Sequence, residues 1–171
     1  MLKLAIGIMV TYWLGQLFGW VLHRFLHSKR AGKLYRSHLT HHRLYTIADF
    51  TSLTYRQAGA DSTTWIFILA AVPIGIIPIL LTVTGVIDWM TMIVVIIEMI
   101  TIGWINSYLH DSFHLTNHWL SQVPGFRKWY QRMLAEHWEH HKHVQHNLGI
   151  YSFITDRVLG TYWTGIRSTH L

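Results

Sequence analysis

The chain has 171 residues, enough for one domain; 51% are hydrophobic, nine are tryptophan, none is cysteine, and the formal net charge is +6. This composition is too apolar and aromatic for an ordinary soluble domain and indicates an integral membrane protein. Without cysteine there is no disulfide, iron–sulfur cluster or thiolate-ligated haem, so any metal must be held by nitrogen or oxygen. The basic residues flank apolar segments, which favours anionic lipid headgroups over nucleic acid as their partners.

Apolar segments predict membrane-spanning helices. The first covers residues 4–22 and is about 30 Å long as a helix, enough to cross a bilayer. It lacks a small-residue cleavage site, so we expect a retained helix rather than a signal peptide. The second covers residues 64–87, and the third covers residues 89–109 after a short turn. We therefore expect an all-α protein with three to four spans in a single domain over residues 1–171.

Two features of these segments need separate interpretation. Pro73, Gly75 and Pro78 interrupt the second segment and predict a bent span, with a re-entrant helical hairpin as the alternative. Glu98 falls in the middle of the third segment, where an ionisable group is costly. It could relay protons or support a metal ligand, or it could be a protonated, hydrogen-bonded structural group, and the residues do not decide between these roles.

Polar segments connect the apolar ones. Residues 28–62 are polar and basic and are expected to flank the membrane. Residues 126–141 alternate apolar and basic positions at helical spacing, which predicts an amphipathic helix at the membrane surface. Residues 147–171 are short and mixed and are expected to pack as a cap.

Eleven histidines occur in four groups within or beside these segments. On a helix, residues three and four apart share a face, so each group directs its imidazoles the same way. A single zinc site needs three or four ligands, so this set suits two ions. Without metals, such a cluster would lose hydration and repel when protonated. The predicted ligands are His23, His27, His38, His41, His42, His110, His114, His118, His137, His140 and His141.

The order of the spans places all four groups on one side of the membrane. If the first span leaves the membrane at His23, the next two return the chain to the same side at His110. Of the fourteen Lys and Arg residues, only Lys3 lies on the opposite side. The positive-inside rule then makes the histidine-rich helical cap cytoplasmic. His143, His146 and His170 are expected to be hydrogen-bonded or interfacial residues instead of ligands.

The motifs narrow the chemistry of such a metal site. The HExxH pattern of zinc proteases is absent, as is the Glu-x-x-His element of carboxylate-bridged di-iron bundles. Imidazole ligands suit iron, and non-haem iron reacts with dioxygen where coordination positions are open. An all-histidine pair of metals at a bilayer surface therefore favours oxygen activation on a lipid-soluble substrate. A membrane metal-binding or transport protein is the alternative, although transporters usually place their ligands near the midplane.

Several motifs resemble a known family, the fatty acid hydroxylase / sterol desaturase superfamily. The similar elements are HRFLH at 23–27, HLTHH at 38–42, HWEHH at 137–141 and NLGIYSFITDRVLGT at 147–161. In the last element, Thr155 stands in place of the usual Trp and Leu159 in place of the usual Phe. The chain's short length, with His110 and His114, also resembles the β-carotene hydroxylase branch, whose first box usually has one more residue. His110 and His118 compete for one ligand position.

The resemblance implies a membrane di-iron enzyme. Its members use two irons, dioxygen and two electrons to hydroxylate or desaturate an unactivated C–H bond, here of a fatty acyl, sterol or carotenoid lipid. Zinc can replace iron in purified protein. Because no haem- or flavin-binding motif is evident, we expect the electrons to come from a separate protein. Supporting partners for the imidazoles could include Asp111, Glu136, Glu139 and Asn147.

Overall fold

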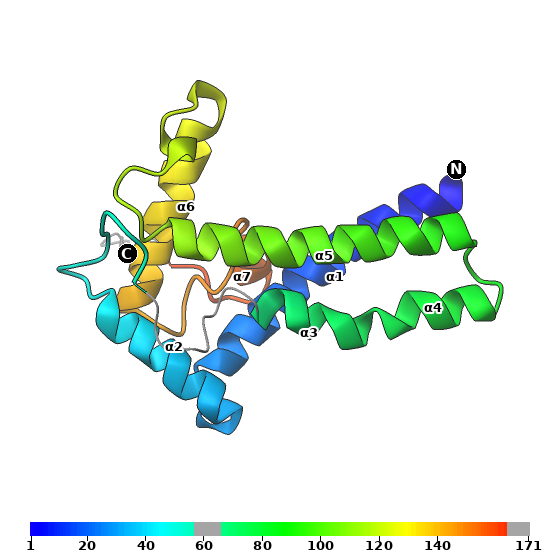
Figure 1. Ribbon diagram of the computed structural model, residues 1–171, viewed down its shortest axis with the longest axis horizontal. Helices are drawn as coiled ribbons and strands as arrows, with labels where there is room; N and C mark the ends of the chain where they lie inside the picture. Colours follow the sequence, from blue (N-terminus) through cyan, green and yellow to red (C-terminus); the bar gives the residue numbers. More distant parts are fainter. Residues whose placement is uncertain (57–65, 164–171) are drawn as a thin grey trace, which may run out of the picture.

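The computed structural model describes residues 1–56 and 66–163, and its elements are helices (Figure 1). An isolated parallel bridge joins Ser52 and Leu115. Thr64, the expected start of the second span, and His170 lie outside the described residues. The elements in chain order are α1 (Leu2–Leu26), η1 (Lys29–Ala31), α2 (Lys33–Leu44), α3 (Ile66–Ile74), α4 (Ile76–Val83), α5 (Trp89–Ser112), η3 (Trp119–Ser121), α6 (Pro124–Lys142) and α7 (Ile154–Val158).

In the described part of the chain, three segments are long and apolar enough to cross a membrane, namely Leu2–Leu26, Ile66–Val83 and Trp89–Ser112. This confirms the expected multi-pass, all-helical class. Both long helices continue past the expected ends of their apolar segments. Consequently each of these two histidines lies on a helix that also crosses the bilayer, His23 on α1 and His110 on α5.

The second span is bent, as the two prolines predicted. α3 ends at Ile74, α4 begins at Ile76, and both pack against α5 (Figure 1). Pro78 has no N–H to donate to the carbonyl of Ile74, four residues earlier, so the helix is interrupted next to that carbonyl, at Gly75. Because α3 and α4 follow α5 towards its two opposite ends, the segment is a kinked span, and the alternative of a re-entrant hairpin is wrong.

Glycines allow the spans to pack closely. A Cβ atom added to Gly15 of α1 would lie 2.9 Å from Cδ1 of Ile102 on α5. A Cβ atom added to Gly103 of α5 would lie 2.9 Å from the carbonyl oxygen of Phe67 on α3. Small residues at helix contacts are the usual means of close packing in membranes, where apolar side chains gain little from leaving lipid.

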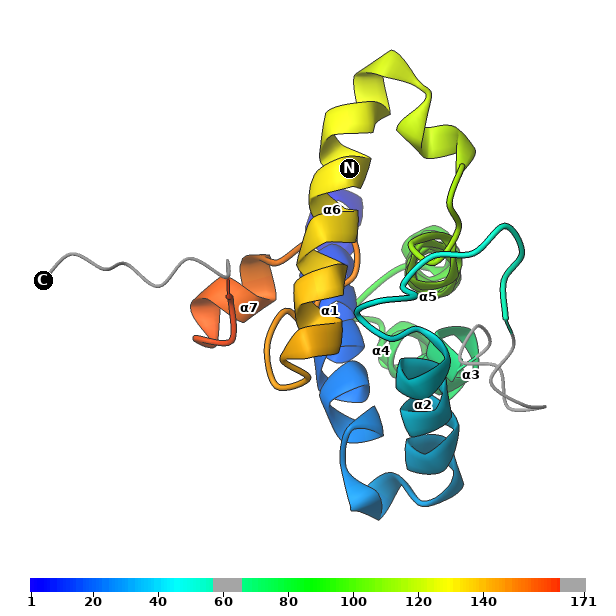
Figure 2. The same ribbon diagram turned by 90° about the vertical axis from the view of Figure 1, so that its left-hand side faces the viewer.

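α2 and α6 form a cap at one end of the spans (Figure 2). The spans run along the long axis of the molecule, and α6 lies across their end, as expected for a helix at the membrane surface (Figure 1). Pro124 starts α6 at a position where its missing N–H costs nothing. Buried apolar residues join cap and spans in one core: Leu22, Phe67, Leu109, Phe113, Leu120, Tyr130, Met133, Ile150 and Phe153.

Candidate metal centre

Nine of the eleven predicted histidines form two groups, within each of which the candidate ligand nitrogens lie within 4.8 Å of one another. We name the groups site 1 and site 2. Site 1 combines residues of α1, α2 and α6 with one that follows α1, whereas site 2 combines residues of α2 and α6 with one that follows α5. Site 1 comprises His23, His27, His38, His42 and His140, and site 2 comprises His41, His114, His137 and His141.

The two HxxHH motifs divide between the sites in opposite ways. On α2, His38 and His42 are four residues apart and share site 1, while His41 turns to site 2. On α6, His137 and His141 share site 2, while His140 turns to site 1. Residues four apart lie one above the other on a helix, and the intervening residue is rotated away from them. Each cap helix therefore contributes to both sites.

Backbone carbonyl groups orient four of the rings. Each of these imidazoles donates a hydrogen bond from Nδ1 to a main-chain oxygen, which fixes the tautomer and turns the Nε2 lone pair inward. The bonds join His23 to Leu148 (2.7 Å), His114 to Phe50 (2.9 Å), His140 to His146 (2.8 Å) and His141 to Tyr45 (2.8 Å). Two of the carbonyls lie in the loop after α2 and two in the loop after α6.

The Nε2 atoms converge within each site, and because each offers either one N–H or one lone pair, the contacts cannot all be hydrogen bonds. His27 Nε2 lies 3.0 Å from His38 Nε2 and 3.1 Å from His140 Nε2. His114 Nε2 lies 3.1 Å from His41 Nε2 and 3.2 Å from His137 Nε2. Because the Nδ1 atoms of His114 and His140 already carry the ring proton, their Nε2 atoms have only a lone pair to offer.

A bound cation removes this conflict between lone pairs. Two ligand nitrogens about 2.1 Å from one ion are about 3.0 Å apart at a right angle and about 3.4 Å apart at a tetrahedral angle. The observed separations of 3.0–3.2 Å fall in that range. Several inward nitrogens, including Nε2 of His23 and His141, are buried and have no hydrogen-bond partner among the described residues. The donor set therefore fits two metal ions.

Burial keeps these imidazoles neutral, which is the form that binds metal. Desolvation lowers the pKa of His27 to about 4 and that of His141 to about 3. Desolvation is also the main cause that holds the pKa of His38, His41, His42, His114, His137 and His140 well below the ordinary value of 6.5. At neutral pH the lone pairs are available without the release of a proton.

The two remaining histidines have different surroundings. His110 is buried beside site 2, with its ring centroid 4.6 Å from that of His41 and 4.9 Å from that of His137. Its Nε2 atom has no hydrogen-bond partner among the described residues. His118 lies outside both groups: its Nε2 atom contacts the Tyr108 hydroxyl at 2.8 Å and its Nδ1 atom accepts from Leu120 N–H.

The arrangement of these histidines can be compared with known families. The family model for fatty acid hydroxylase matches residues 8–161, which contain all four histidine groups. The chain belongs to the fatty acid hydroxylase family. No curated protein and no solved structure matches it. Membership together with the two histidine sites identifies an oxidoreductase of the non-haem di-iron type.

A loop and a short helix near the C-terminal end of the matched region hold site 1 in this member of the family. The carboxylate of Asp156, in the first turn of α7 (Ile154–Val158), is fully buried. It accepts hydrogen bonds from the backbone N–H groups of Leu148 (2.8 Å) and Gly149 (2.7 Å) and from the indole of Trp20 on α1 (3.1 Å). Asp156 thus fixes the peptide whose carbonyl orients His23. Sequence reasoning assigned the aspartate no such role.

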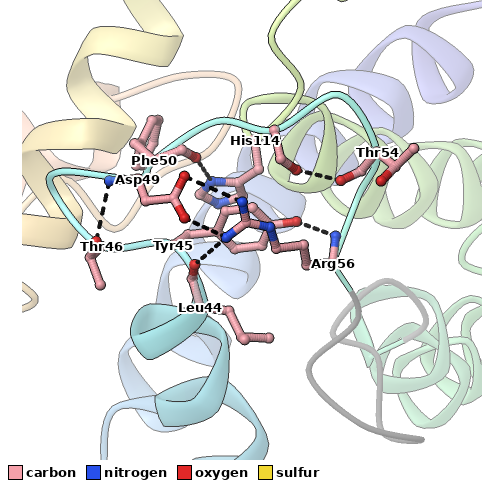
Figure 3. A network of polar contacts seen from close by, with 9 residues as sticks. Leu44, Tyr45, Thr46, Asp49, Phe50, Thr54, Arg56 and His114 are labelled. Carbon is pink, nitrogen blue, oxygen red and sulfur yellow. Dashed lines mark hydrogen bonds and ion pairs between the residues drawn. The ribbon is translucent and has the colours of Figure 1, made fainter.

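A different loop holds site 2 (Figure 3). Tyr45 stacks on His114 with ring centroids 4.0 Å apart, and the carbonyl of Phe50 accepts the hydrogen bond from Nδ1 of His114. The guanidinium group of Arg56 pairs with Asp49 and bonds the carbonyl of Leu44, which closes the loop. This support comes mostly from backbone and aromatic groups, which no sequence motif identifies.

The expected supporting residues have varied contacts. Asn147 donates to the carboxylate and the carbonyl of Glu136, so both brace the loop after α6. Glu139 instead pairs with Lys142 at 2.7 Å. Asp111 lies 3.4 Å from Nδ1 of His110. Glu98 lies twelve residues before His110 on the same helix, about 18 Å away, and contacts neither site in the described part of the chain.

An apolar cavity of about 470 Å³ runs between α1, α3, α4 and α5. It extends from Gly7, at the end of α1 far from the metal sites, to Gly19 and Asn106. One helical turn beyond Gly19 comes His23, and one turn beyond Asn106 comes His110. The histidine sites therefore lie next to an apolar space of a kind suited to a hydrocarbon chain.

Proposed function

We propose that this protein is a di-iron oxygenase that hydroxylates an unactivated C–H bond of a bilayer lipid. The observation that carries this proposal is the apolar cavity, because its inner end lies one helical turn from His23 and His110. From Gly7 to Gly19, a separation of twelve residues, the cavity extends about 18 Å along α1. A lipid chain in the cavity would present a carbon near its inner end to the metal centre.

We further propose a ligand set of ten histidines, five for each ion. Site 1 takes a pair from α1, a pair from α2 and one residue of α6. Site 2 follows the same pattern of two pairs and one single residue if His110 and His114, four residues apart, form its second pair. The burial of His110 and its unpartnered Nε2 atom support this assignment, which leaves His118 out of the set.

The protein's own groups would bind the chain, orient it and exclude water. Irons bound to these histidines would activate dioxygen, with two electrons supplied from outside the protein. The cavity wall is apolar except for groups such as Thr11, Thr91 and Asn106, so it would hold a hydrocarbon by shape. The core that joins the cap to the spans would keep bulk water from the oxidised carbon.

The apolar cavity and the basic residues of the cap support proposals for the protein's partners and for its orientation in the membrane. We propose that the lipid enters from the bilayer and that a separate protein donates electrons. The basic residues of α2 and α6, which include Arg36 and Arg127, would contact phospholipid headgroups or that donor. The charge distribution favours a cytoplasmic location for the metal centre.

Metal content tests the ligand set. Protein purified in mild detergent should contain about two ions per chain, whether iron or zinc, by elemental mass spectrometry. His140→Ala should lower this number to about one or less, whereas His143→Ala, an exposed histidine at the end of the same helix, should not change it. Two ions that persist in His140→Ala would refute the ligand assignment.

Product analysis tests the reaction. Iron-loaded protein with oxygen and a chemical reductant should convert an acyl, sterol or carotenoid lipid to a product that contains one more oxygen atom. A product that lacks two hydrogens would instead identify a desaturase. If two irons are bound and no lipid of the three classes is oxidised, the oxygenase proposal is wrong. Metal flux in vesicles would then favour the transport alternative.

A further inference from the structure

A second pocket lies on the opposite side of α5 from the apolar cavity. Its volume is about 350 Å³, and its wall comes from the last two turns of α5, the start of α3 and the residues before and within η3. Trp104 and Trp119 line it, and about half of each side chain is exposed. Tryptophan is typical of the level at which lipid headgroups meet the hydrocarbon. We call this space the interfacial pocket.

The hydroxyl group of Tyr108 offers a free hydrogen-bond donor to the interfacial pocket. Burial lowers the pKa of His118, so its ring is neutral, and because Nδ1 accepts from Leu120 N–H, the proton is on Nε2. His118 Nε2 and the indole N–H of Trp119 therefore both donate to the hydroxyl oxygen of Tyr108, at 2.8 and 2.6 Å. Tyr108 must direct its own proton to a third group.

A second hydroxyl group in the pocket wall also lacks a partner. Ser107 is only 1% exposed, and its Oγ atom has no hydrogen-bond partner among the described residues. Burial of an unpaired hydroxyl costs about 1–3 kcal/mol. Ser107 and Tyr108 together would satisfy a ligand that brings hydrogen-bond acceptors, such as the oxygens of a phosphodiester.

The charge of the interfacial pocket is unlike that of its surroundings. The chain has fourteen Lys and Arg residues, but none of the described residues that line this pocket is among them. The wall instead carries the carboxylate of Asp111 beside the aromatic rings of Trp104, Tyr108 and Trp119. A carboxylate and aromatic rings attract an ammonium group and do not favour a net anion.

We propose that the interfacial pocket binds the zwitterionic headgroup of a phospholipid, such as phosphocholine or phosphoethanolamine. Asp111 and the aromatic rings face the ammonium group, and the hydroxyls of Ser107 and Tyr108 donate to the phosphodiester. The site is separate from the apolar cavity because α3 and α5 lie between them: Phe67 lines the cavity and Ile68 lines the pocket. It does not depend on the proposed oxygenase activity.

Native mass spectrometry of the metal-loaded protein in detergent tests the proposal. The protein is offered equal amounts of phosphatidylcholine and phosphatidylglycerol with the same acyl chains. The wild type should retain phosphatidylcholine preferentially, and Trp104→Ala and Asp111→Asn should each lower that preference at least about threefold. Trp89→Ala is the matched control, because Trp89 is a similarly exposed tryptophan at the other end of α5.

The outcomes are distinct. Loss of the preference in Trp104→Ala and Asp111→Asn, with Trp89→Ala unchanged, supports the headgroup site. Equal retention of both lipids by the wild type, or a preference for phosphatidylglycerol, overturns it. An equal loss in Trp89→Ala also overturns it, because lipid would then be bound non-specifically around the spans. If Trp104→Ala does not fold, Asp111→Asn with normal metal content is the test: loss of the preference supports the headgroup site, and an unchanged preference overturns it.

Discussion

Site 1 and site 2 have nearly the same ligand pattern but are supported by different parts of the chain. The carbonyls that orient His23 and His140 belong to the loop after α6, which Asp156 fixes. The carbonyls that orient His114 and His141 belong to the loop after α2. One support is centred on a buried carboxylate, whereas the other combines main-chain and aromatic contacts with a surface ion pair. The two sites should therefore respond differently to changes outside their ligands.

The largest effect is expected from Asp156→Ala. It leaves the N–H groups of Leu148 and Gly149 and the indole of Trp20 without their acceptor, at a cost of about 3 kcal/mol or more. The free energy of unfolding in detergent should fall by this amount, and metal should be lost from site 1 before site 2. Asp156→Asn, which keeps an acceptor, should lose less. Normal stability and two ions in Asp156→Ala would contradict this role.

Two single changes sharpen the comparison at the ligand level. His110→Ala should remove the fifth ligand of site 2 and lower the affinity of that site about tenfold or more, measured by competition with a chelator. His118→Ala should leave the affinity of both sites unchanged, because both of its ring nitrogens bond elsewhere. The reverse result would place His118 in the metal centre and remove the symmetry between the sites.

Acid should weaken the metal-free protein over a defined pH range. The folded-state pKa is lowered for these buried histidines, to about 4 for His27 and about 3 for His141. The unfolded chain therefore binds more protons below about pH 6.5, so the stability of the folded state should decrease from there towards pH 4. Denaturant unfolding at several pH values measures this slope. His27→Ala should make it shallower, and an unchanged slope would contradict the assignment.

The smallest effect is expected at the surface of the site 2 loop. Asp49→Asn breaks the ion pair with Arg56, which is exposed and contributes little. Metal content should stay at about two, in contrast to the loss expected for Asp156→Ala. Loss of an ion from Asp49→Asn would mean that the loop depends on this pair as strongly as site 1 depends on its carboxylate.

Sequence alone predicted the parts of this structure that depend on local composition and residue spacing. The spans follow from apolar length, the bend from Pro73 and Pro78, and the histidine groups from spacings of three and four residues. The division of each HxxHH motif between two sites was not predicted, because it depends on how α2 and α6 face each other. The orienting carbonyls were not predicted either, because every residue has one and only the folded loop selects which is used. The role of Glu98 stays a prediction.

The contact between Trp20 and Asp156 has a consequence for biosynthesis. The two residues are 136 positions apart, so at about 5–20 residues per second Asp156 is made roughly 7–27 s after Trp20. By then the first span and the two that follow it have already been synthesised. The peptide that orients His23 is therefore complete only after the spans have been made. Site 1 accordingly cannot reach its complete geometry until late in the synthesis of the chain.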